Sequence, residues 1–318
     1  MANNVENEIV LIGSGTMAEE YAKVLRGMGK KFVVIGRGET SALRFESRNS
    51  CEVFRGGIDK YLQTKEIGGR KIIVSVNVDQ LAFVSKRVIE AGAKELLLEK
   101  PGGLDAREIE SVAEVASKME AYVALAYNRR FYASTLKAKE IIAEDGGVDS
   151  FSFEFTEWSH EIEKLTIPKA VKENWLLANS SHVIDLAFYL GGWPEDFKAF
   201  VRGSLPWHSA ASSFAGSGKS SLGALFSYQA NWDAPGRWGV EVLTKNRRLI
   251  FRPLEKLQLQ MRGSVAIDSI QIDDSLEKEY KPGLFLQVKD FVQNERSRFA
   301  SIQDQAKHLN VYDRICGK

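Results

Sequence analysis

The sequence predicts an α/β protein with a doubly wound parallel sheet in its first part and an α+β domain with an open, mostly antiparallel sheet in its second. In the first 126 residues, short apolar runs alternate with segments of helical periodicity, and strands that alternate with helices pair in parallel through right-handed crossovers. Later in the chain, short alternating runs follow one another with turns between them, as antiparallel strands do. We therefore expect domains at residues 1–126 and 127–318.

Composition narrows the class of partner. The chain has 318 residues, and its 43 basic and 42 acidic residues leave a formal charge of +1, so neither nucleic acid nor an anionic membrane is an expected partner. The cysteines, Cys51 and Cys316, are too few for a disulfide framework. The apolar run Ile9–Ile12 is too short for a signal-peptide core or a membrane span. We expect a cytoplasmic protein with a small-molecule substrate.

A glycine turn follows the first expected strand, Glu8–Ile12. The turn, Gly13-Ser-Gly-Thr-Met-Ala18, leads into apolar residues at helical spacing that stop near Gly27. This G-x-G-x-x-A spacing is the dinucleotide fingerprint, in which the first glycine allows the tight turn and the second lets backbone amides approach a pyrophosphate at the helix start. The expected cofactor contacts here are Gly13, Ser14, Gly15, Thr16 and Met17.

The second expected strand, Lys31–Ile35, carries the signal for cofactor choice. It ends in Gly36-Arg37-Gly38, where an NAD enzyme commonly has an acid for the ribose 2′-hydroxyl. An arginine there suits a 2′-phosphate, and Thr40 and Ser41 could donate further hydrogen bonds. NADP is therefore favoured over NAD. The alternative is that Arg37 is a solvated turn residue.

Three more strands complete this half after a mixed polar segment, residues 43–69, that contains a possible short strand near Val53 and a helix near residues 58–66. Arg70–Val78 is a buried-type strand, and Asn77 at its carboxyl end is a candidate contact for the ribose or nicotinamide. A helix follows, and then the strand Leu96–Leu98. Residues 121–126 form the last strand expected in this domain.

The strand Leu96–Leu98 ends abruptly in Glu99-Lys100-Pro101. Open α/β sheets bind their ligands at the carboxyl ends of strands, and burying a lysine ammonium is costly unless it has a partner. Glu99 is therefore a candidate cofactor-side residue that positions Lys100 by charge pairing. The alternative is an ordinary strand end with solvated charges and a turn.

The second half begins with Tyr127-Asn-Arg-Arg-Phe131, a helix, and an alternating strand over residues 148–158. A polar segment, residues 161–173, is expected as a loop over the substrate site, with Trp158 and Lys172 on the substrate side. Further strands are expected at residues 197–202, 220–232, 238–244, 248–252, 256–261 and 269–272, followed by two closing helices.

One face of that sheet is expected to be free to meet a second subunit, with exposed Phe and Trp supporting oligomerisation. The segment Gly216-Ser-Gly-Lys-Ser220 is only a fragment of a P-loop, because it lacks the first glycine at the required spacing and the following helix. Nucleoside triphosphate binding is therefore not expected there.

Four motifs in order resemble those of the glucose-fructose oxidoreductase and inositol dehydrogenase family (Gfo/Idh/MocA). They are Gly13–Ala18, Glu99-Lys100-Pro101, Tyr127–Phe131 and Ser181-His-Val-Ile-Asp185 with the apolar residues up to Gly191. The resemblance covers nearly the whole chain. It implies an N-terminal Rossmann domain that binds NAD(P) and a C-terminal α+β domain that holds the substrate and builds dimers or tetramers.

The resemblance also implies roles for single residues. Lys100 corresponds to the lysine that contacts the reacting hydroxyl or carbonyl, and His182 to the histidine that exchanges the proton. Arg129 or Arg130 is a ligand contact or a structural bridge between domains, with a solvated pair at a helix start as the alternative. No metal site is expected.

The sequence departs from the family pattern four residues before the histidine, where many members carry an aspartate and this chain has Ala178. Asn179 could supply a substrate hydrogen bond instead. Asp185 lies at i+3 from His182 on the expected helix, so it could orient the imidazole ring from a supporting position.

The expected function is hydride transfer between a nicotinamide and a hydroxyl or carbonyl carbon of a sugar or sugar derivative, possibly nucleotide-linked, a substrate choice that rests on the resemblance alone. Two alternatives stay open. One keeps the enzyme class with a non-sugar carbonyl, imine, dihydrodiol or double bond as substrate. The other, motivated by Ala178, is a regulatory protein that binds NADP(H) without turnover.

Overall fold

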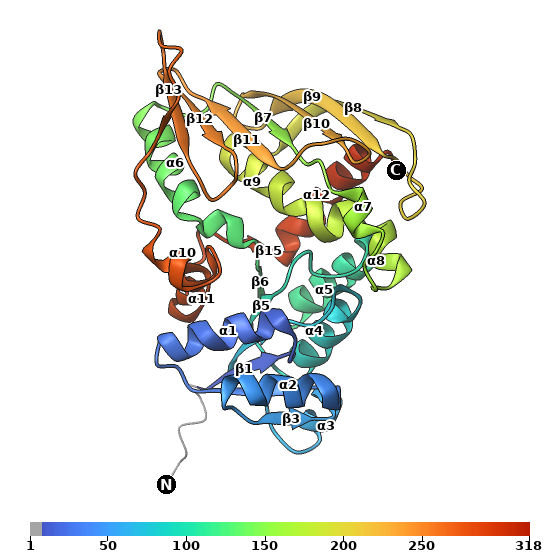
Figure 1. Cartoon of the computed structure of the whole chain (residues 1–318). Coiled ribbons are helices and arrows are strands. Elements are labelled where there is room, and N and C mark those ends of the chain that lie inside the picture. Colours follow the sequence, from blue (N-terminus) through green and yellow to red (C-terminus); the bar gives the residue numbers. More distant parts are fainter. Residues whose placement is uncertain (1–7) are drawn as a thin grey trace. The chain divides into compact units, whose positions relative to one another are not determined.

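A computed structural model describes residues 8–318 (Figure 1). The chain divides into two compact units, each with its own sheet. Unit 1 takes in the chain as far as Asn128 together with Lys278–Lys307, and unit 2 takes in Arg129–Glu277 and His308–Lys318. In the part of the chain described, no helix is both long and apolar enough to cross a membrane.

Unit 1 is built on a seven-stranded sheet in the order β3-β2-β1-β4-β5-β6-β15. Neighbouring strands are parallel except β15, which pairs antiparallel with β6. The bounds are β1 (Ile9–Ile12), β2 (Phe32–Gly36), β3 (Val53–Arg55), β4 (Lys71–Val74), β5 (Glu95–Leu98), β6 (Tyr122–Leu125) and β15 (Ala300–Ser301).

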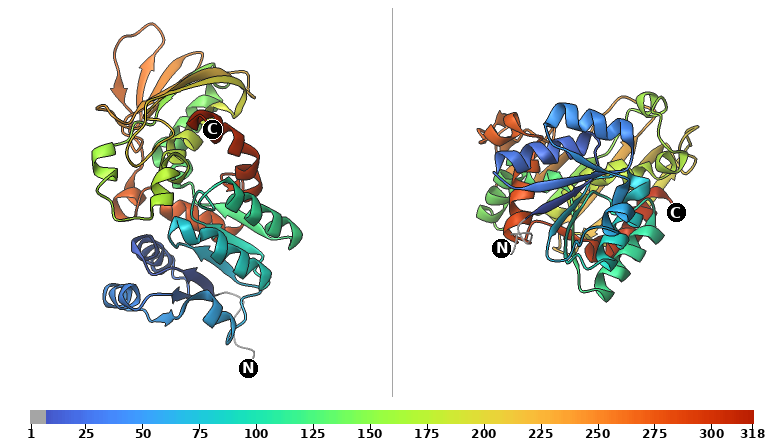
Figure 2. Two further views of the ribbon diagram at one scale, coloured as in Figure 1. Left: turned by 90° about the vertical axis from the view of Figure 1, so that its right-hand side faces the viewer. Right: turned by 90° about the horizontal axis from the view of Figure 1, so that it is seen from below.

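Helices lie on both faces of this sheet, with α1 and α2 on one face and α4 and α5 on the other (Figure 2). The helices of this part are α1 (Thr16–Gly27), α2 (Glu39–Asn49), α3 (Gly57–Leu62), η1 (Val78–Gln80), α4 (Leu81–Glu90), α5 (Ala106–Lys118) and α11 (Leu284–Gln293). Burial from both sides explains why β1, β4 and β5 are continuous apolar runs rather than alternating ones.

The strand order reverses next to β1, which lies between β2 and β4. The chain runs outward through β2 and β3 and then returns to place β4 on the other side of β1. Diverging connections at such a point leave a crevice at the carboxyl ends of the two strands, the usual ligand site of an open α/β sheet.

Unit 2 has an eight-stranded sheet in the order β14-β13-β12-β11-β7-β10-β9-β8. All neighbours are antiparallel except β7 and β10, which are parallel. The bounds are β7 (Ser150–Glu154), β8 (Pro194–Arg202), β9 (Ser213–Ser220), β10 (Leu225–Asn231), β11 (Gly239–Leu243), β12 (Arg247–Phe251), β13 (Gln258–Met261) and β14 (Asp268–Ser269).

Helix α9 (Ser181–Gly191) packs on β7 and β11 and covers one face of this sheet. An aromatic cluster forms the contact, because Phe151 and Phe153 of β7 both pack edge-on against Phe188 of α9. The other helices of the second half are η2 (Asn128–Phe131), α6 (Ala133–Glu144), α7 (Ser159–Ile162), α8 (Lys169–Glu173), η3 (Leu176–Ser180), α10 (Ser275–Glu279) and α12 (Ile302–Cys316).

The opposite face of the second sheet is more exposed. Along β10 the residues alternate strictly, and Leu225, Ser227, Gln229 and Asn231 are exposed. Phe200 of β8 lies on the same face, because its register partner in β9, Ala215, pairs with Gln229 of β10. Phe200 is 69% exposed and Leu225 is 63% exposed.

The predicted fold class is confirmed, and the structure differs locally from several sequence-based expectations. Residues 39–49 are helical where the sequence indicated a turn and mixed polar segment. The run 220–232 contains the end of β9, a turn and β10, and the expected strand at 269–272 is reduced to β14. Gly216–Ser220 lies within strand β9.

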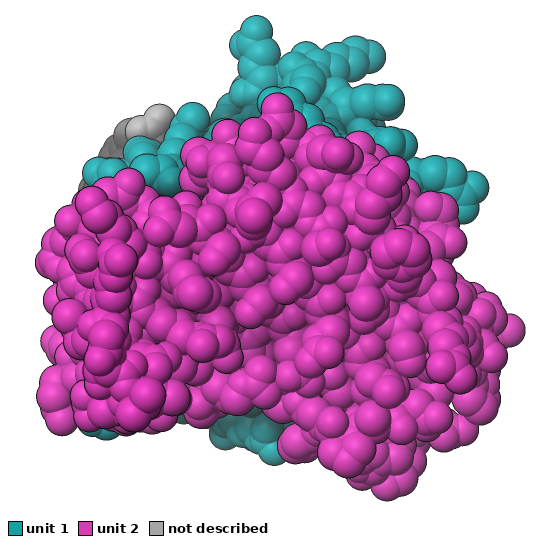
Figure 3. All heavy atoms as spheres, turned by 90° about the horizontal axis from the view of Figure 1, so that it is seen from above, with its two compact units in different colours: residues 1–128, 278–307 teal, residues 129–277, 308–318 magenta. Residues whose placement is uncertain are grey.

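The predicted domain boundary and the observed compact units assign residues 278–307 differently (Figure 3). That segment was expected in the C-terminal domain, but it packs with unit 1. Strand β15 adds to the edge of the first sheet beside β6, and the Asn128 side chain donates to the Pro282 carbonyl at 3.0 Å. These contacts join residues far apart in sequence, which local patterning does not register.

Candidate functional site

The turn between β1 and α1 has the geometry of a phosphate cradle. Gly13 has a φ of +125°, and a Cβ on it would lie 2.0 Å from the Ser75 carbonyl oxygen at the end of β4, so only glycine fits. Gly15 precedes α1 with extended backbone, and a Cβ there would have nothing within 4 Å. Thr16 and Met17 are the first residues of α1, whose first turn has no side-chain cap. Its unsatisfied N–H groups suit an anion.

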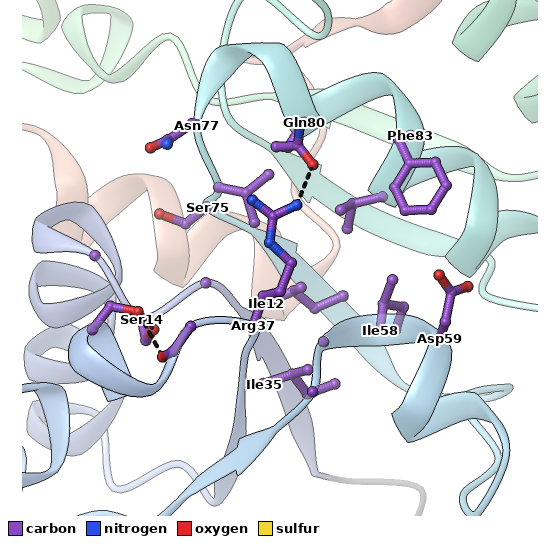
Figure 4. A pocket seen from close by; sticks show the side chains of 18 of the residues that line it. Ile12, Ser14, Ile35, Arg37, Ile58, Asp59, Ser75, Asn77, Gln80 and Phe83 are labelled. Carbon is purple, nitrogen blue, oxygen red and sulfur yellow. Dashed lines mark hydrogen bonds between the residues drawn. The ribbon is translucent and has the colours of Figure 1, made fainter. Parts of the chain in front are cut away.

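A cavity of about 440 Å³ opens beside this turn (Figure 4). On the β2 side it is lined by Arg37, Ser41 and Arg44, and Gly38 precedes α2 with no side-chain cap. Arg37 donates to the Gln80 amide oxygen at 2.9 Å, as the dashed line in Figure 4 shows. Two guanidinium groups and a hydroxyl next to a helix start favour a phosphate monoester at the end of β2.

The sequence pointed to Arg37 and Ser41 here but missed Arg44, because the helix that carries it was not predicted. The Ser14 hydroxyl donates to the Ser41 hydroxyl at 3.0 Å, which ties the glycine turn to the start of α2. Thr40, also expected, is the second residue of α2 and is not among the residues that line the cavity.

The opposite wall of the cavity comes from the segment after β4. Ser75, Val76 and Asn77 line it, so the structure brings the predicted Asn77 into the same cavity as Gly13 and Arg37. Asn77 directly precedes η1. The cavity therefore gathers backbone amides, two guanidinium groups and an amide side chain at the crevice between β1 and β4.

Glu99 and Lys100 follow β5, and neither lines this cavity. The Tyr21 hydroxyl on the buried face of α1 donates to the Glu99 carboxylate at 2.6 Å. Burial, and next the Glu99 charge, raise the pKa of Tyr21 well above its ordinary value, so the phenol keeps its proton. The sequence did not suggest Tyr21, because it occupies an ordinary core position of an amphipathic helix.

In unit 2 a buried carboxylate holds the segment before α9. Glu157, with a side chain 2% exposed, accepts hydrogen bonds from the Asn179 amide at 3.0 Å and the Ser180 hydroxyl at 2.7 Å. Burial raises the pKa of Glu157, and the hydrogen bonds from Ser180 and Asn179 oppose the rise. Asn179, predicted to contact substrate, therefore uses its N–H donor on Glu157. Asn179 and Ser180 both lie in η3, a π-helical turn of the kind often found at functional sites.

His182 is the second residue of α9 and is 9% exposed, with its ring 6.2 Å from that of Trp238 between centroids. The hydrogen bonds that the structure gives Asp185 go to Arg130, which donates to its two carboxylate oxygens at 2.8 and 2.6 Å. Asp185 was expected to orient the His182 ring, but these hydrogen bonds join it to Arg130 instead. The Arg130 guanidinium carbon also lies 4.5 Å from the centroid of the Tyr189 ring.

Two predicted substrate-side residues gather around Trp238. The Arg129 guanidinium carbon lies 5.1 Å from the Trp238 ring centroid. The Arg237 guanidinium carbon lies 4.9 Å from both the Trp238 and the Trp158 rings. Trp158 is half exposed, and its indole N–H donates to the Gly236 carbonyl at 3.0 Å. The structure therefore places Arg129 and His182 next to the Trp238 ring, and Trp158 against the Arg237 guanidinium that also contacts Trp238.

Lys172 lies elsewhere in unit 2. Its ammonium donates to the Glu163 carbonyl at 2.8 Å, which closes the segment between α7 and α8. The sequence missed Glu157, Arg237 and Trp238. Glu157 falls at the end of the strand expected over residues 148–158. Arg237 and Trp238 directly precede β11, and the pairing of β11 with β7 is visible only in the sheet register.

Comparison with known proteins supports the fold and leaves the chemistry open. No protein-family model and no curated protein sequence matches the chain. Among solved structures, a levoglucosan dehydrogenase in complex with NADH and L-sorbose matches with a TM-score of 0.78 and 16% identity, over 98% of this chain and 95% of that chain.

Two other solved structures match at similar levels. The UDP-N-acetylglucosamine 3-dehydrogenase GnnA from Acidithiobacillus ferrooxidans has a TM-score of 0.74 and 15% identity, over 97% of this chain and 96% of that chain. An NAD binding oxidoreductase from Klebsiella pneumoniae has a TM-score of 0.77 and 16% identity, over 97% and 95%. At these identities the likeness shows a shared fold, and activity has to be argued from the site.

Proposed function

We propose that the chain is an NAD(P)-dependent oxidoreductase, with NADP preferred, that transfers a hydride between the nicotinamide and a hydroxyl or carbonyl carbon of a sugar or sugar derivative. The observation that carries the proposal is the cavity at the crevice between β1 and β4. There a glycine that tolerates no side chain, an uncapped helix start and the Arg37–Arg44 pair fit the pyrophosphate and 2′-phosphate of a dinucleotide. The neighbouring structures named above support the sugar class.

The cofactor, when bound, supplies the hydride carrier, and the protein supplies binding, orientation and electrostatics. Gly13 and Gly15 admit the pyrophosphate, while Arg37, Ser41 and Arg44 hold the phosphate on the adenosine ribose. Lys100 donates a hydrogen bond to the reacting oxygen and stabilises negative charge that develops there. The hydrogen bond from the Tyr21 hydroxyl to the Glu99 carboxylate, at 2.6 Å, holds the backbone that leads into Lys100.

His182 acts as general acid or base, taking the substrate proton when a hydroxyl is oxidised and returning it when a carbonyl is reduced. The buried Glu157 holds the turn before α9 through Asn179 and Ser180, which fixes the start of the helix that carries His182. Ala178 is buried in that turn and offers no carboxylate. The carboxylate that contacts the turn is Glu157, which belongs to the segment after β7.

Cofactor titration is the first test. NADPH and NADH fluorescence are titrated with the purified protein, and turnover is followed at the nicotinamide absorbance band with free and nucleotide-linked sugars. We expect both nucleotides to bind, NADPH more tightly, and at least one sugar to be turned over. No binding of either nucleotide would overturn the proposal, and tight binding without turnover would favour a regulatory NADP(H)-binding protein.

The chemical role of Lys100 has its own test. Lys100→Ala should leave the NADPH dissociation constant within about two-fold and lower kcat by roughly 10²-fold or more, because it removes an interaction that strengthens as charge develops. Full turnover by a Lys100→Ala variant with normal cofactor binding would contradict the mechanism.

We also propose that the exposed face of the second sheet is the contact between copies of this chain in a dimer or tetramer. Phe200 and Leu225 lie on that face among small and polar side chains, and large exposed apolar side chains on one flat surface are typical of contact sites.

A further inference from the structure

Arg237 is held between two indole rings in unit 2. Its guanidinium carbon lies 4.9 Å from the ring centroids of both Trp158 and Trp238. The hydrogen bond from the Trp158 indole to the Gly236 carbonyl, at 3.0 Å, fixes that ring against the residue that precedes Arg237. A guanidinium packed on aromatic rings retains its N–H donors around its edge, where they suit a planar or tetrahedral anion.

Those donors are little used within unit 2. The side chain is 50% exposed, and in residues 8–318 its described polar partner is the Glu157 carboxylate at 3.6 Å, which is outside hydrogen-bond range. Glu157 gives its other oxygen to Asn179 and Ser180. Burial raises the pKa of Glu157, and the Arg237 charge is one of the causes that oppose this rise.

The position of Arg237 ties it to the candidate acid–base group. Trp238, the ring beneath Arg237, is itself within 6.2 Å of the His182 ring, and Arg129 lies over the same indole at 5.1 Å. Arg237 and His182 therefore both lie next to the Trp238 ring. Trp158 adds a half-exposed aromatic surface next to them.

We propose that Arg237 binds an anionic group, a carboxylate or a phosphate, carried by the substrate, and that Trp158 packs against the sugar ring next to that group. This inference rests on the proposed function and narrows its substrate class from sugars in general to sugar acids or sugar phosphates. Arg237 determines specificity, while His182 remains the residue that exchanges the proton.

Calorimetric titration of the full-length protein tests this with three probes: glucose, glucuronate and glucose 6-phosphate, each with and without saturating NADP. At least one of the two anions should bind at least about ten-fold more tightly than glucose, and whichever anion does so distinguishes a carboxylate site from a phosphate site. Arg237→Gln should abolish that preference. Arg237→Lys should keep part of it, because it retains the charge without the planar donor set.

Arg248→Gln is the matched control. Arg248 lies on β12 of the same unit, its side chain is 45% exposed, and it pairs with Glu241. The substitution therefore removes one positive charge, as Arg237→Gln does, but at a residue with no described contact to Trp238. It should leave the anion preference unchanged. Equal affinity for glucose and both anions, no binding of either anion, or an unchanged preference in Arg237→Gln would each overturn the inference. NADPH titration of the same variants judges the cofactor proposal separately, since Arg237 belongs to unit 2 and the cofactor cavity to unit 1.

Discussion

Two glycines two positions apart illustrate how single residues divide structural and binding roles. Gly13 is required by the fold, because its backbone has a positive φ and its Cα faces the Ser75 carbonyl. Gly15 has ordinary extended backbone with open space beside it, so the fold itself would accept a side chain there. If the open space is where a pyrophosphate lies, the second glycine is required only by the ligand.

Substituting each glycine by alanine should separate these roles. Gly13→Ala should lower the free energy of unfolding by about 2 to 5 kcal/mol, because the new Cβ meets backbone at a conformation that alanine disfavours. Gly15→Ala should change the free energy of unfolding by less than about 0.5 kcal/mol. Urea unfolding measures both.

Cofactor binding gives the second readout for the same pair. Gly15→Ala should weaken NADPH binding by roughly ten-fold or more, a change of about 1.4 kcal/mol, since the Cβ occupies the approach to the phosphates. A Gly15→Ala protein that binds NADPH as tightly as the original chain would argue against a pyrophosphate at this turn.

Arg44 and Arg48 provide a test of the NADP preference from one helix. Both lie on α2 near Glu19, with side chains 50% and 61% exposed, but only Arg44 lines the cavity. Arg44→Gln should weaken NADPH binding by roughly ten-fold, the effect of one charge-assisted phosphate contact, and leave NADH binding unchanged. Arg48→Gln should change neither dissociation constant. Equal losses for NADPH and NADH in Arg44→Gln would place the 2′-phosphate elsewhere.

At the scale of elements, hydrogen bonds between a helix end and a turn hold together segments of unit 2 that are distant in sequence. Asp145, which caps the end of α6, accepts from Arg247 at 2.8 Å through both oxygens and from Thr244 at 2.6 Å. These bonds fasten the turn between β11 and β12 to the end of α6. The Arg247 hydrogen bond is the largest cause that holds the pKa of Asp145 well below its ordinary value.

Asp145→Asn should therefore make stability less dependent on pH. A carboxyl with a lowered pKa in the folded state stabilises the fold above its ordinary pKa, near 4, and loses that contribution as pH falls toward the folded value. At pH 7 the variant should be less stable by about 2 to 3 kcal/mol. The difference from the original chain should shrink below about pH 4.

Urea unfolding at several pH values measures the effect. Glu144→Gln is the control, because Glu144 pairs with the same arginine but its side chain is 57% exposed, and the expected cost is below about 1 kcal/mol. A constant difference between Asp145→Asn and the original chain from pH 7 down to pH 3 would contradict the linkage.

Helix α2 shows why one element escaped prediction. Its buried residues are Ala42, Phe45 and Asn49, so only one strongly apolar side chain faces the core, and the rest of the helix is polar or charged. Periodicity methods need several apolar residues on one face. The helix forms because it packs beside α1 and β3, and it carries the Arg44 that the cavity uses.

At the scale of the whole molecule, the exposed face of the second sheet leads to an expectation about assembly. Phe200→Glu and Leu225→Glu together place like charges on that face without removing a buried side chain. If two copies associate there, sedimentation should show the original chain as a dimer or tetramer and the double variant as a monomer, because burying unpaired charges is costly.

The matched control for this experiment is Val265→Lys, since Val265 is 94% exposed but lies outside the strands of the sheet. It should leave the assembly unchanged. An original chain that sediments as a monomer, or a double variant that keeps the same assembly, would remove this face from consideration.

The local signals of the sequence were sufficient for the parallel strands of the first sheet. Continuous apolar strands, helical spacing between them and the glycine turn after β1 are short-range features, and the positions of Gly13, Arg37 and Asn77 around one cavity follow from the parallel order that they imply. The alternating strands of the second half likewise indicated an antiparallel sheet. Their exact ends were less well predicted, because the turn between β9 and β10 contains few strand-breaking residues.

By itself, therefore, the sequence determined the fold class and the dinucleotide-type turn, because those depend on residue type and nearest neighbours along the chain. Lys100 and His182 became candidates through the resemblance to a known family, and their roles stay predictions. Only the tertiary structure decided that residues 278–307 belong with unit 1, that Asp185 pairs with Arg130, and that Glu157 and Arg237 join the surroundings of Trp238. The physical reason is that burial and pairing of these groups depend on contacts between segments distant in sequence. A linear pattern of residues does not specify the partners of such contacts.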